Sequence, residues 1–186
     1  MNAPTLPPSP PSPYSSALAT SNIESHTLSV LVDNEPGVLA RVVGLFSGRG
    51  YNIESLTVAE VAHAEHLSRI TIVTSGTPEA IEQIRHQLER LVPVHRVTDL
   101  TAEGGAVERE LAMIKVRGKG ENRVEALRLS EAFRCRVIDA TTESFVFELT
   151  GAPSKIDSFV ELMRPVGLVE VSRTGVAAIS RGPGAM

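Results

Sequence analysis

The sequence has few of the residues that build most catalytic and metal sites. It contains no tryptophan, one cysteine (Cys135) and five histidines among 186 residues. A single cysteine excludes a disulfide within the chain and suits a reducing cytoplasm, where we expect this protein. Cys135 lies between Arg134 and Arg136, two cations that favour a thiolate, but it has no obvious histidine partner. We therefore interpret it as a packing residue or spectator thiol rather than a nucleophile.

The sequence also lacks a strong charge bias and a long apolar run. The formal net charge is −4 and no long basic run occurs, so nucleic acid is not an expected partner. No segment approaches the roughly 20 apolar residues of a membrane span, so we expect no membrane association. Residues 1–23 are rich in proline and serine and contain no lysine or arginine, unlike secretory signals and transit peptides. We expect this extension to be disordered.

Groups suited to metal binding and catalysis are equally sparse. Only His63 and His66 are close in the sequence, and no third ligand is nearby, so we expect a solvated loop without a metal. The segment Arg-Gly-Lys-Gly at residues 117–120 is too short for a phosphate-binding loop of the Walker or dinucleotide type. We therefore expect no catalytic residue in this chain.

The most informative segment runs from Leu31 to Ile53 and reads LVDNEPGVLARVVGLFSGRGYNI. It leaves a predicted strand, turns, and continues as a predicted helix. Asn34 is a good N-cap, Pro36 suits the first helical position, and Gly37 lets a ligand approach the backbone. The free N–H groups and the positive dipole end of a helix start favour a small anion such as a carboxylate. Such a turn also occurs for purely structural reasons, so both interpretations are open at this point.

Periodicity extends this segment into a complete module. The helix carries an apolar stripe and ends at Gly48 and Gly50. The stripe consists of Val38, Leu39, Val42, Leu45 and Phe46. Strands are predicted at residues 53–58 and 67–74, with a loop at 59–66 between them. A second predicted helix begins at Thr77-Pro78 and ends before Pro93. Residues 94–100 are predicted to form a fourth strand. This order predicts an α+β, ferredoxin-like βαββαβ fold with both helices on one face of an antiparallel sheet.

A second module of the same order follows. We expect a linker at residues 101–107 and a tail at residues 183–186. The predicted strands of the second module are 110–116, 136–140, 144–149 and 168–172, and its predicted helices are 121–133 and 153–163. The chain is thus predicted to contain two tandem ferredoxin-like modules, at residues 24–100 and 108–182. The second lacks the Asn-x-Pro-Gly turn, so the first is the candidate if only one module binds a ligand.

The run DNEPGVLARVVGLFSGRGYNIESLTV closely resembles the first segment of the regulatory (small) subunit of acetohydroxyacid synthase, also called acetolactate synthase. Four later segments resemble the same family in the same order, so the resemblance covers roughly residues 26–182. These segments are LSRITIVT, EQIRHQLERLVPVHRV, VERELAMIKV and VEVSRTGVAAISRG. The resemblance implies that residues 24–100 form an ACT domain, a module that binds amino acids, and that residues 108–182 form an ACT-like domain.

In this family the ACT domains of two chains pair, so the resemblance implies a homodimer that binds valine, an allosteric ligand, at its interface. One chain would supply the strand-to-helix turn and the other the entry to its second strand. The residues implied in the turn are Asn34, Glu35, Pro36, Gly37, Val38 and Leu39, and those implied in the entry are Asn52 and Ile53. Backbone N–H groups and Asn34 would bind the carboxylate and Asn52 the ammonium, while Val38, Leu39 and Ile53 would enclose the aliphatic side chain.

The resemblance also implies a partner, a separate catalytic (large) subunit that carries thiamine diphosphate (ThDP), Mg²⁺ and FAD and that this chain activates. Valine bound here would inhibit the first shared step of branched-chain amino-acid synthesis, while this chain itself carries no cofactor. The alternatives are a free-standing ACT-type amino-acid sensor and a small enzyme on a ferredoxin-like fold. The sequence does not choose among valine, leucine and isoleucine, because each methylene changes affinity by only about 1 to 3 kcal/mol.

Overall fold

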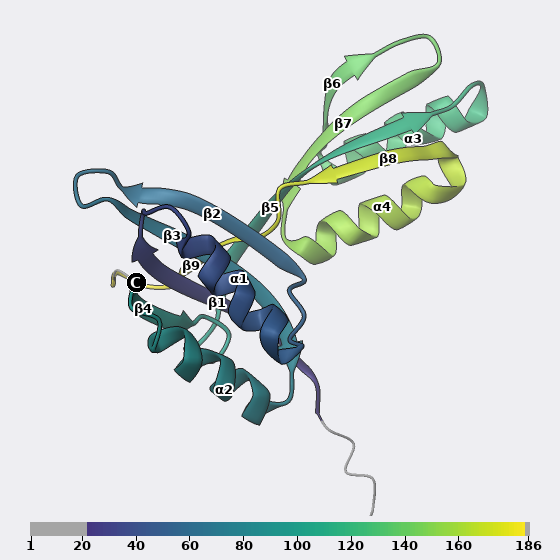
Figure 1. Ribbon diagram of the computed structural model, residues 1–186. Helices are drawn as coiled ribbons and strands as arrows, with labels where there is room; N and C mark the ends of the chain where they lie inside the picture. Colours follow the sequence, from purple (N-terminus) through teal and green to yellow (C-terminus); the bar gives the residue numbers. More distant parts are fainter. Residues whose placement is uncertain (1–21, 185–186) are drawn as a thin grey trace, which may run out of the picture.

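A computed structural model describes residues 22–184 (Figure 1). They form two units of sheet and helix that follow one another along the chain. Residues 1–21 of the extension that we expect to be disordered lie outside the described residues. Residues 185 and 186 of the predicted tail also lie outside them. Among residues 22–184, no helix is both long and apolar enough to cross a membrane.

The first unit has the predicted order of elements. They are β1 (Glu24–Asp33), α1 (Val38–Arg49), β2 (Ser55–Ala62), β3 (Leu67–Gly76), α2 (Pro78–Glu89) and β4 (Val94–Asp99). The four strands form one antiparallel sheet in the order β2-β3-β1-β4, so β2 and β4 are its edges. Both helices cover the same face of this sheet (Figure 1). The predicted ferredoxin-like βαββαβ fold is confirmed.

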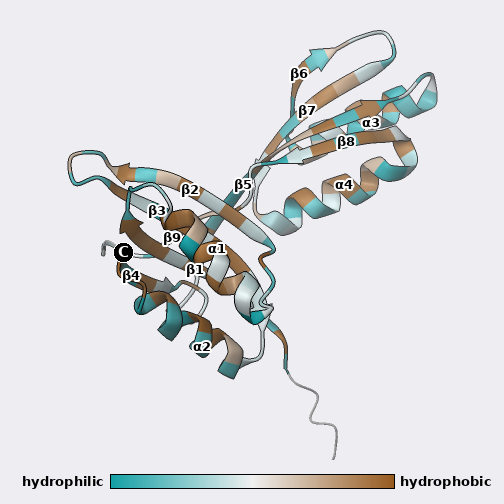
Figure 2. Cartoon of the chain, in the orientation of Figure 1, coloured by the Kyte–Doolittle hydropathy of each residue, from teal (hydrophilic) through white to brown (hydrophobic). Residues whose placement is uncertain are grey.

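Alternation along β1 explains which face is covered. Leu28, Val30 and Val32 are buried in the core beneath the helices. Thr27 and Ser29 lie on the opposite face of the sheet, which carries no helix and is here called the open face. Hydrophobic and hydrophilic residues also alternate along α2 and α4, as expected of helices with one buried side (Figure 2). Helix α2 begins as predicted, because Pro78 is in its first turn and the Ala80 N–H donates to the Thr77 hydroxyl at 3.3 Å.

The second unit repeats this architecture. Its elements are β5 (Ala106–Arg117), α3 (Glu121–Phe133), β6 (Arg136–Ala140), β7 (Ser144–Gly151), α4 (Pro153–Gly167) and β8 (Leu168–Arg173). The sheet order is β6-β7-β5-β8, which is the same arrangement as in the first unit. Phe147, Phe159 and Ile156 are fully buried between this sheet and its helices. The prediction of two tandem modules is confirmed.

Several predicted boundaries were wrong, and α4 is four residues longer than the predicted helix at 153–163. Strand β2 continues to Ala62, so the predicted loop at residues 59–66 is only the short turn before β3. Its final residues Ala59, Glu60 and Val61 are exposed on an edge strand, which makes their sequence look like that of a loop. Strand β5 begins at Ala106, inside the predicted linker at 101–107.

The early start of β5 is explained by an additional strand that we did not predict, β9 (Ala177–Ser180). Residues Ala106 to Arg109 pair antiparallel with β9, and the remainder of β5 pairs with β7 and β8. One continuous strand therefore belongs to a short two-stranded ribbon at its beginning and to the second sheet at its end (Figure 1).

This β5–β9 ribbon and the chain that leads into it contact the open face of the first sheet. The Thr27 hydroxyl donates to the Glu108 carboxylate at 2.6 Å, and the Thr57 hydroxyl donates to the Val176 carbonyl at 2.7 Å. The two units are therefore connected by hydrogen bonds as well as by the covalent chain.

Candidate functional site

The turn between β1 and α1 is exposed and differs in detail from the predicted helix start. The helix begins at Val38, with Gly37 as its N-cap and no side-chain capping bond. Asn34 is therefore not the N-cap, and Pro36 is not the first helical residue, which corrects both predictions. Gly37 has φ 89° and ψ −8°, the values of the third residue of a type II turn, and Pro36 occupies the second position that proline favours. The Val38 N–H closes this turn on the Glu35 carbonyl at 3.4 Å.

The turn presents backbone donors to solvent. In the part of the chain that the structure describes, the N–H groups of Leu39 and Ala40 have no hydrogen-bond acceptor. Both residues are exposed and lie in the first turn of α1, where the helix dipole is positive. These two groups can bind a carboxylate, as predicted for the start of this helix. A side chain at Gly37 would meet nothing within 4 Å, so space for a ligand is open there.

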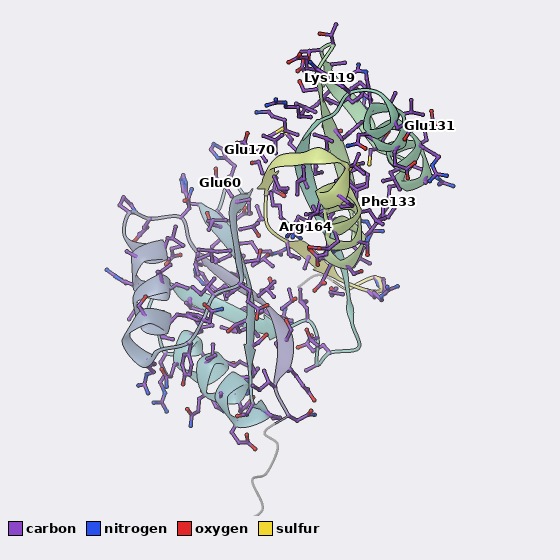
Figure 3. The ribbon with its side chains drawn as sticks, turned by 90° about the vertical axis from the view of Figure 1, so that its right-hand side faces the viewer. Glu60, Lys119, Glu131, Phe133, Arg164 and Glu170 are labelled. Carbon is purple, nitrogen blue, oxygen red and sulfur yellow. The ribbon has the colours of Figure 1, made fainter. Side chains whose placement is uncertain are left out.

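Asn34 is held between neighbouring elements. Its backbone N–H donates to the His66 carbonyl at 2.7 Å, which ties the turn to the β2–β3 hairpin. Glu60, near the end of β2 and labelled in Figure 3, lies close to Asn34. Hydrogen bonds from His63, at 3.0 Å, and from Asn34 hold the pKa of the Glu60 carboxyl below its usual value. Glu60 is therefore ionised at neutral pH beside the turn.

The aliphatic residues predicted at this site have different environments. Val38 is 4 % exposed and packs in the first core, whereas Leu39 is 41 % exposed beside the turn. Ile53 is half-buried against the same core from its place before β2. Asn52 is exposed, and its carbonyl accepts a hydrogen bond from the Thr74 hydroxyl at 2.6 Å.

Within one chain, the two predicted halves of the site are far apart. Asn34 follows Asp33, which pairs with Leu67 on β3, whereas Asn52 contacts Thr74 at the other end of β3. Thr74 is seven positions after Leu67 on β3, which corresponds to a distance of roughly 23 Å along the strand. An amino acid spans only a small part of this distance, so one chain cannot enclose it with both halves.

Strand β2 connects these two halves along an open edge. It starts just after Asn52 and Ile53 and ends at Ala62, beyond Glu60. Among the described residues, β3 is the only strand that pairs with it. Val58 and Val61 on this edge are exposed. The edge of β2 therefore has unpaired backbone groups and apolar side chains available for another chain.

Other groups considered as reactive do not form a site. Burial raises the pKa of the Cys135 thiol to about 11, and Lys155 offsets this effect only in part. The flanking arginines therefore do not activate this cysteine, in agreement with a packing role. Among residues 22–184, no three histidine, cysteine or acidic side chains are grouped as metal ligands.

One polar cluster was not predicted. Arg173, at the end of β8, donates to both oxygens of Glu110 on β5, with 2.8 Å to the first, and to Asp157 on α4 at 2.6 Å. These bonds, chiefly those to Glu110, raise the pKa of Arg173 above its ordinary value. The cluster lines a cleft of about 860 Å³ between the two units. Because Arg173 and Glu110 are 63 residues apart, no local pattern in the sequence could reveal the pair.

Comparison with known proteins identifies the family. A family model described as the small subunit of acetolactate synthase matches residues 109–182, and one described as the AHAS small subunit-like ACT domain matches residues 28–96. The chain is 46% identical over 157 residues to the probable acetolactate synthase small subunit of Archaeoglobus fulgidus, and this match covers 84% of this chain and 97% of that protein. The chain belongs to the acetolactate synthase small-subunit family. The predicted family is therefore confirmed, and the first unit is an ACT domain.

Two further relatives agree with this assignment. The acetolactate synthase isozyme 3 small subunit of Escherichia coli is 48% identical over 156 residues, covering 83% of this chain and 94% of that protein. The crystal structure of the acetolactate synthase small subunit from Thermotoga maritima has a TM-score of 0.77 and 41% identity, covering 87% of this chain and 99% of that chain. The family model and these relatives are described as small subunits of acetolactate synthase, so the prediction that this chain is a subunit of that enzyme and not an enzyme by itself is confirmed.

Proposed function

We propose that this chain activates the ThDP-dependent catalytic subunit of acetolactate synthase and makes that subunit sensitive to inhibition by valine. The observation that carries the proposal is the arrangement of the two half-sites. The donor-rich turn from Asn34 to Leu39 and the entry at Asn52 and Ile53 lie at opposite ends of one open edge strand. This arrangement favours an effector site made by two chains.

A homodimer through β2 would complete such a site. If two β2 edges pair antiparallel about a twofold axis, the start of each strand lies beside the end of the other. Asn52 and Ile53 of one chain would then approach Asn34 and Glu60 of its partner. The pairing would also cover Val58 and Val61, which a single chain leaves exposed. A twofold dimer of this kind has two equivalent sites.

The groups in this site match a small aliphatic amino acid. The N–H groups of Leu39 and Ala40 and the Asn34 amide would bind the carboxylate, and the partner's Asn52 the ammonium. Glu60 is ionised and adds a negative charge near the ammonium. Leu39 and Ile53 would contact the aliphatic side chain, with Val38 supporting the turn from the core.

Valine can inhibit only if it binds two states of the assembly with different affinity. Couplings of this kind are typically about 1 to 3 kcal/mol. We assign ThDP, Mg²⁺ and FAD to the catalytic subunit, as the family resemblance implies, and the whole assembly to the cytoplasm. A free-standing ACT-type sensor would bind valine equally well but would leave the catalytic subunit unaffected.

Reconstitution separates these possibilities. We expect the purified chain alone to form no acetolactate from pyruvate, because we assign the cofactors of that reaction to the catalytic subunit. Added to the catalytic subunit, it should raise the rate several-fold and make that rate sensitive to valine. A rate that is the same with and without the chain would contradict the proposal and leave only the sensor. The catalytic subunit with and without valine, in the absence of this chain, is the control.

A further inference from the structure

We propose that the contact between β2 and the backbone of Val176 carries the effect of valine from the ACT domain to the second domain. This inference rests on the proposed function and adds the residues that transmit the regulation. The contact, here called the β2–Val176 contact, consists of Ser55, Thr57, Gly175 and Val176.

Both backbone polar groups of Val176 bind the edge strand. Its N–H donates to the Ser55 hydroxyl at 2.9 Å, and its carbonyl accepts from the Thr57 hydroxyl at 2.7 Å. Val176 is buried, and Ser55 and Thr57 point to the same open face of the sheet because they are two residues apart on one strand. Two hydrogen bonds from one strand therefore fix one residue of the chain that enters β9.

Gly175 makes this contact tight. It has φ 83°, which favours glycine, and it lies directly against β2. A Cβ atom at this position would be 2.8 Å from the Ser55 hydroxyl oxygen and 3.1 Å from the Thr57 methyl carbon. Any larger residue at position 175 would push this segment away from β2. Because the contact is this close, a movement of β2 would displace residues 175 and 176 directly.

The contact begins next to the proposed effector site. Ser55 is two residues after Ile53, and Glu54 between them is bound to the sheet by its N–H, which donates to the Val73 carbonyl at 2.8 Å. Strand β2 has one neighbour in the sheet, so it is less constrained than β1, which has two. A ligand that moves Asn52 and Ile53 would move the start of β2 and, with it, Ser55 and Thr57.

On the other side, the contact leads into the second domain within three residues. The Thr174 N–H donates to the Leu111 carbonyl at 3.0 Å, and Arg173 is bound to Glu110 and Asp157. Leu111 and Glu110 belong to β5, one of the two inner strands of the second sheet (Figure 1). Among the described residues, the remaining side-chain hydrogen bond between the domains, from Thr27 to Glu108, starts on β1, two strands away from β2 but in the same row as Ser55, because both Thr27 and Ser55 pair with Val73 on β3. The β2–Val176 contact is the connection that starts on β2 itself, the strand that directly follows Asn52 and Ile53.

The double variant Ser55→Ala, Thr57→Val tests this inference in the reconstituted enzyme, since it removes both hydroxyls and nearly keeps the side-chain volumes. We expect valine to bind the isolated small subunit with a Kd within about twofold of the wild type, and activation to persist. The valine concentration for half-inhibition should rise about tenfold or more, within the range of roughly 5- to 150-fold that allosteric couplings span. The variant Ser55→Ala, Thr57→Ser keeps the hydroxyl at position 57, so it should be more sensitive to valine than the double variant that lacks both hydroxyls.

Thr71→Val is the matched control. Thr71 pairs with Thr57, is buried on the same face, and makes no side-chain hydrogen bond within the described residues. We expect it to leave half-inhibition unchanged. Normal valine binding together with unchanged half-inhibition in the double variant would overturn the inference.

Hydrogen exchange on the wild-type chain provides a test that does not depend on a variant that folds. Valine should change the exchange rate of the Val176 amide by about tenfold, in line with the coupling expected above, and leave amides in α3 unchanged. An unchanged Val176 amide in a chain saturated with valine would overturn the inference but not the proposed function. A wild-type chain that binds no valine would contradict both.

Discussion

Replacing Asn34 by alanine should raise the valine concentration that half-inhibits reconstituted acetolactate synthase by about 10- to 150-fold and leave activation intact. A hydrogen bond to a charged group contributes about 1.5 to 3 kcal/mol, which corresponds to this range of affinity. The Asn34 side chain is exposed and does not cap α1, so its loss should not unfold the ACT domain. The measurement is the rate of acetolactate formation against valine concentration.

Asn122→Ala is the control for this prediction. Asn122 is also exposed, but it lies in the second domain, in the first turn of α3. Its replacement should leave valine inhibition unchanged. If Asn34→Ala and Asn122→Ala have the same sensitivity as the wild type, Asn34 does not belong to the effector site. Gly37→Ala should act like Asn34→Ala, because a Cβ strains the φ of 89° in the turn.

Replacing Arg173 by leucine should lower the free energy of unfolding by about 3 kcal/mol at neutral pH. The Glu110 side chain is only 4 % exposed, and Arg173 is the cation bound to both of its oxygens. Without Arg173, a buried carboxylate on β5 remains without its charge partner. Urea denaturation followed by circular dichroism measures the loss.

Arg128→Leu provides the matched comparison. Arg128 binds both oxygens of Glu125 through the same two kinds of nitrogen, at 2.8 and 2.7 Å, but its side chain is 74 % exposed. Solvent screens such a pair, so its loss should cost less than about 1 kcal/mol. If the two variants lose the same free energy of unfolding, burial of Glu110 is not the cause of the loss in Arg173→Leu.

Features with local signals were predicted well from the sequence. Helix α2 starts where Thr77 and Pro78 indicate, because a hydroxyl acceptor and a proline in the first turn act within a few residues. Helix α1 starts two residues later than predicted. A Pro-Gly pair satisfies a type II turn as well as a helix start, and here the turn forms first.

Features that depend on distant partners were missed. Strand β9 pairs with Ala106 to Arg109, about 70 residues earlier in the chain, and it is only four residues long. The Arg173–Glu110 pair and the β2–Val176 contact likewise join positions far apart in sequence. The edge strand β2 was predicted too short, because its exposed end has the composition of a loop.

The candidate site lies between these two cases. The donor-rich turn could be predicted from Asn34, Pro36 and Gly37 as a place for a small anion, and the family resemblance added Asn52 and Ile53. Only the strand register shows that the two groups are separated by most of the length of the sheet. This separation is what makes a site shared between two chains the favoured arrangement.

Calorimetric titration of a mixed dimer tests the shared site most directly. Asn34→Ala and Asn52→Ala chains should each bind valine weakly. When they are mixed at equal amounts and allowed to exchange, half of the dimers are mixed, and each mixed dimer has one site in which both asparagines are intact. We therefore predict that about one quarter of the sites recover wild-type affinity for valine. No recovery, in a mixture shown to exchange subunits, would contradict a site shared between two chains.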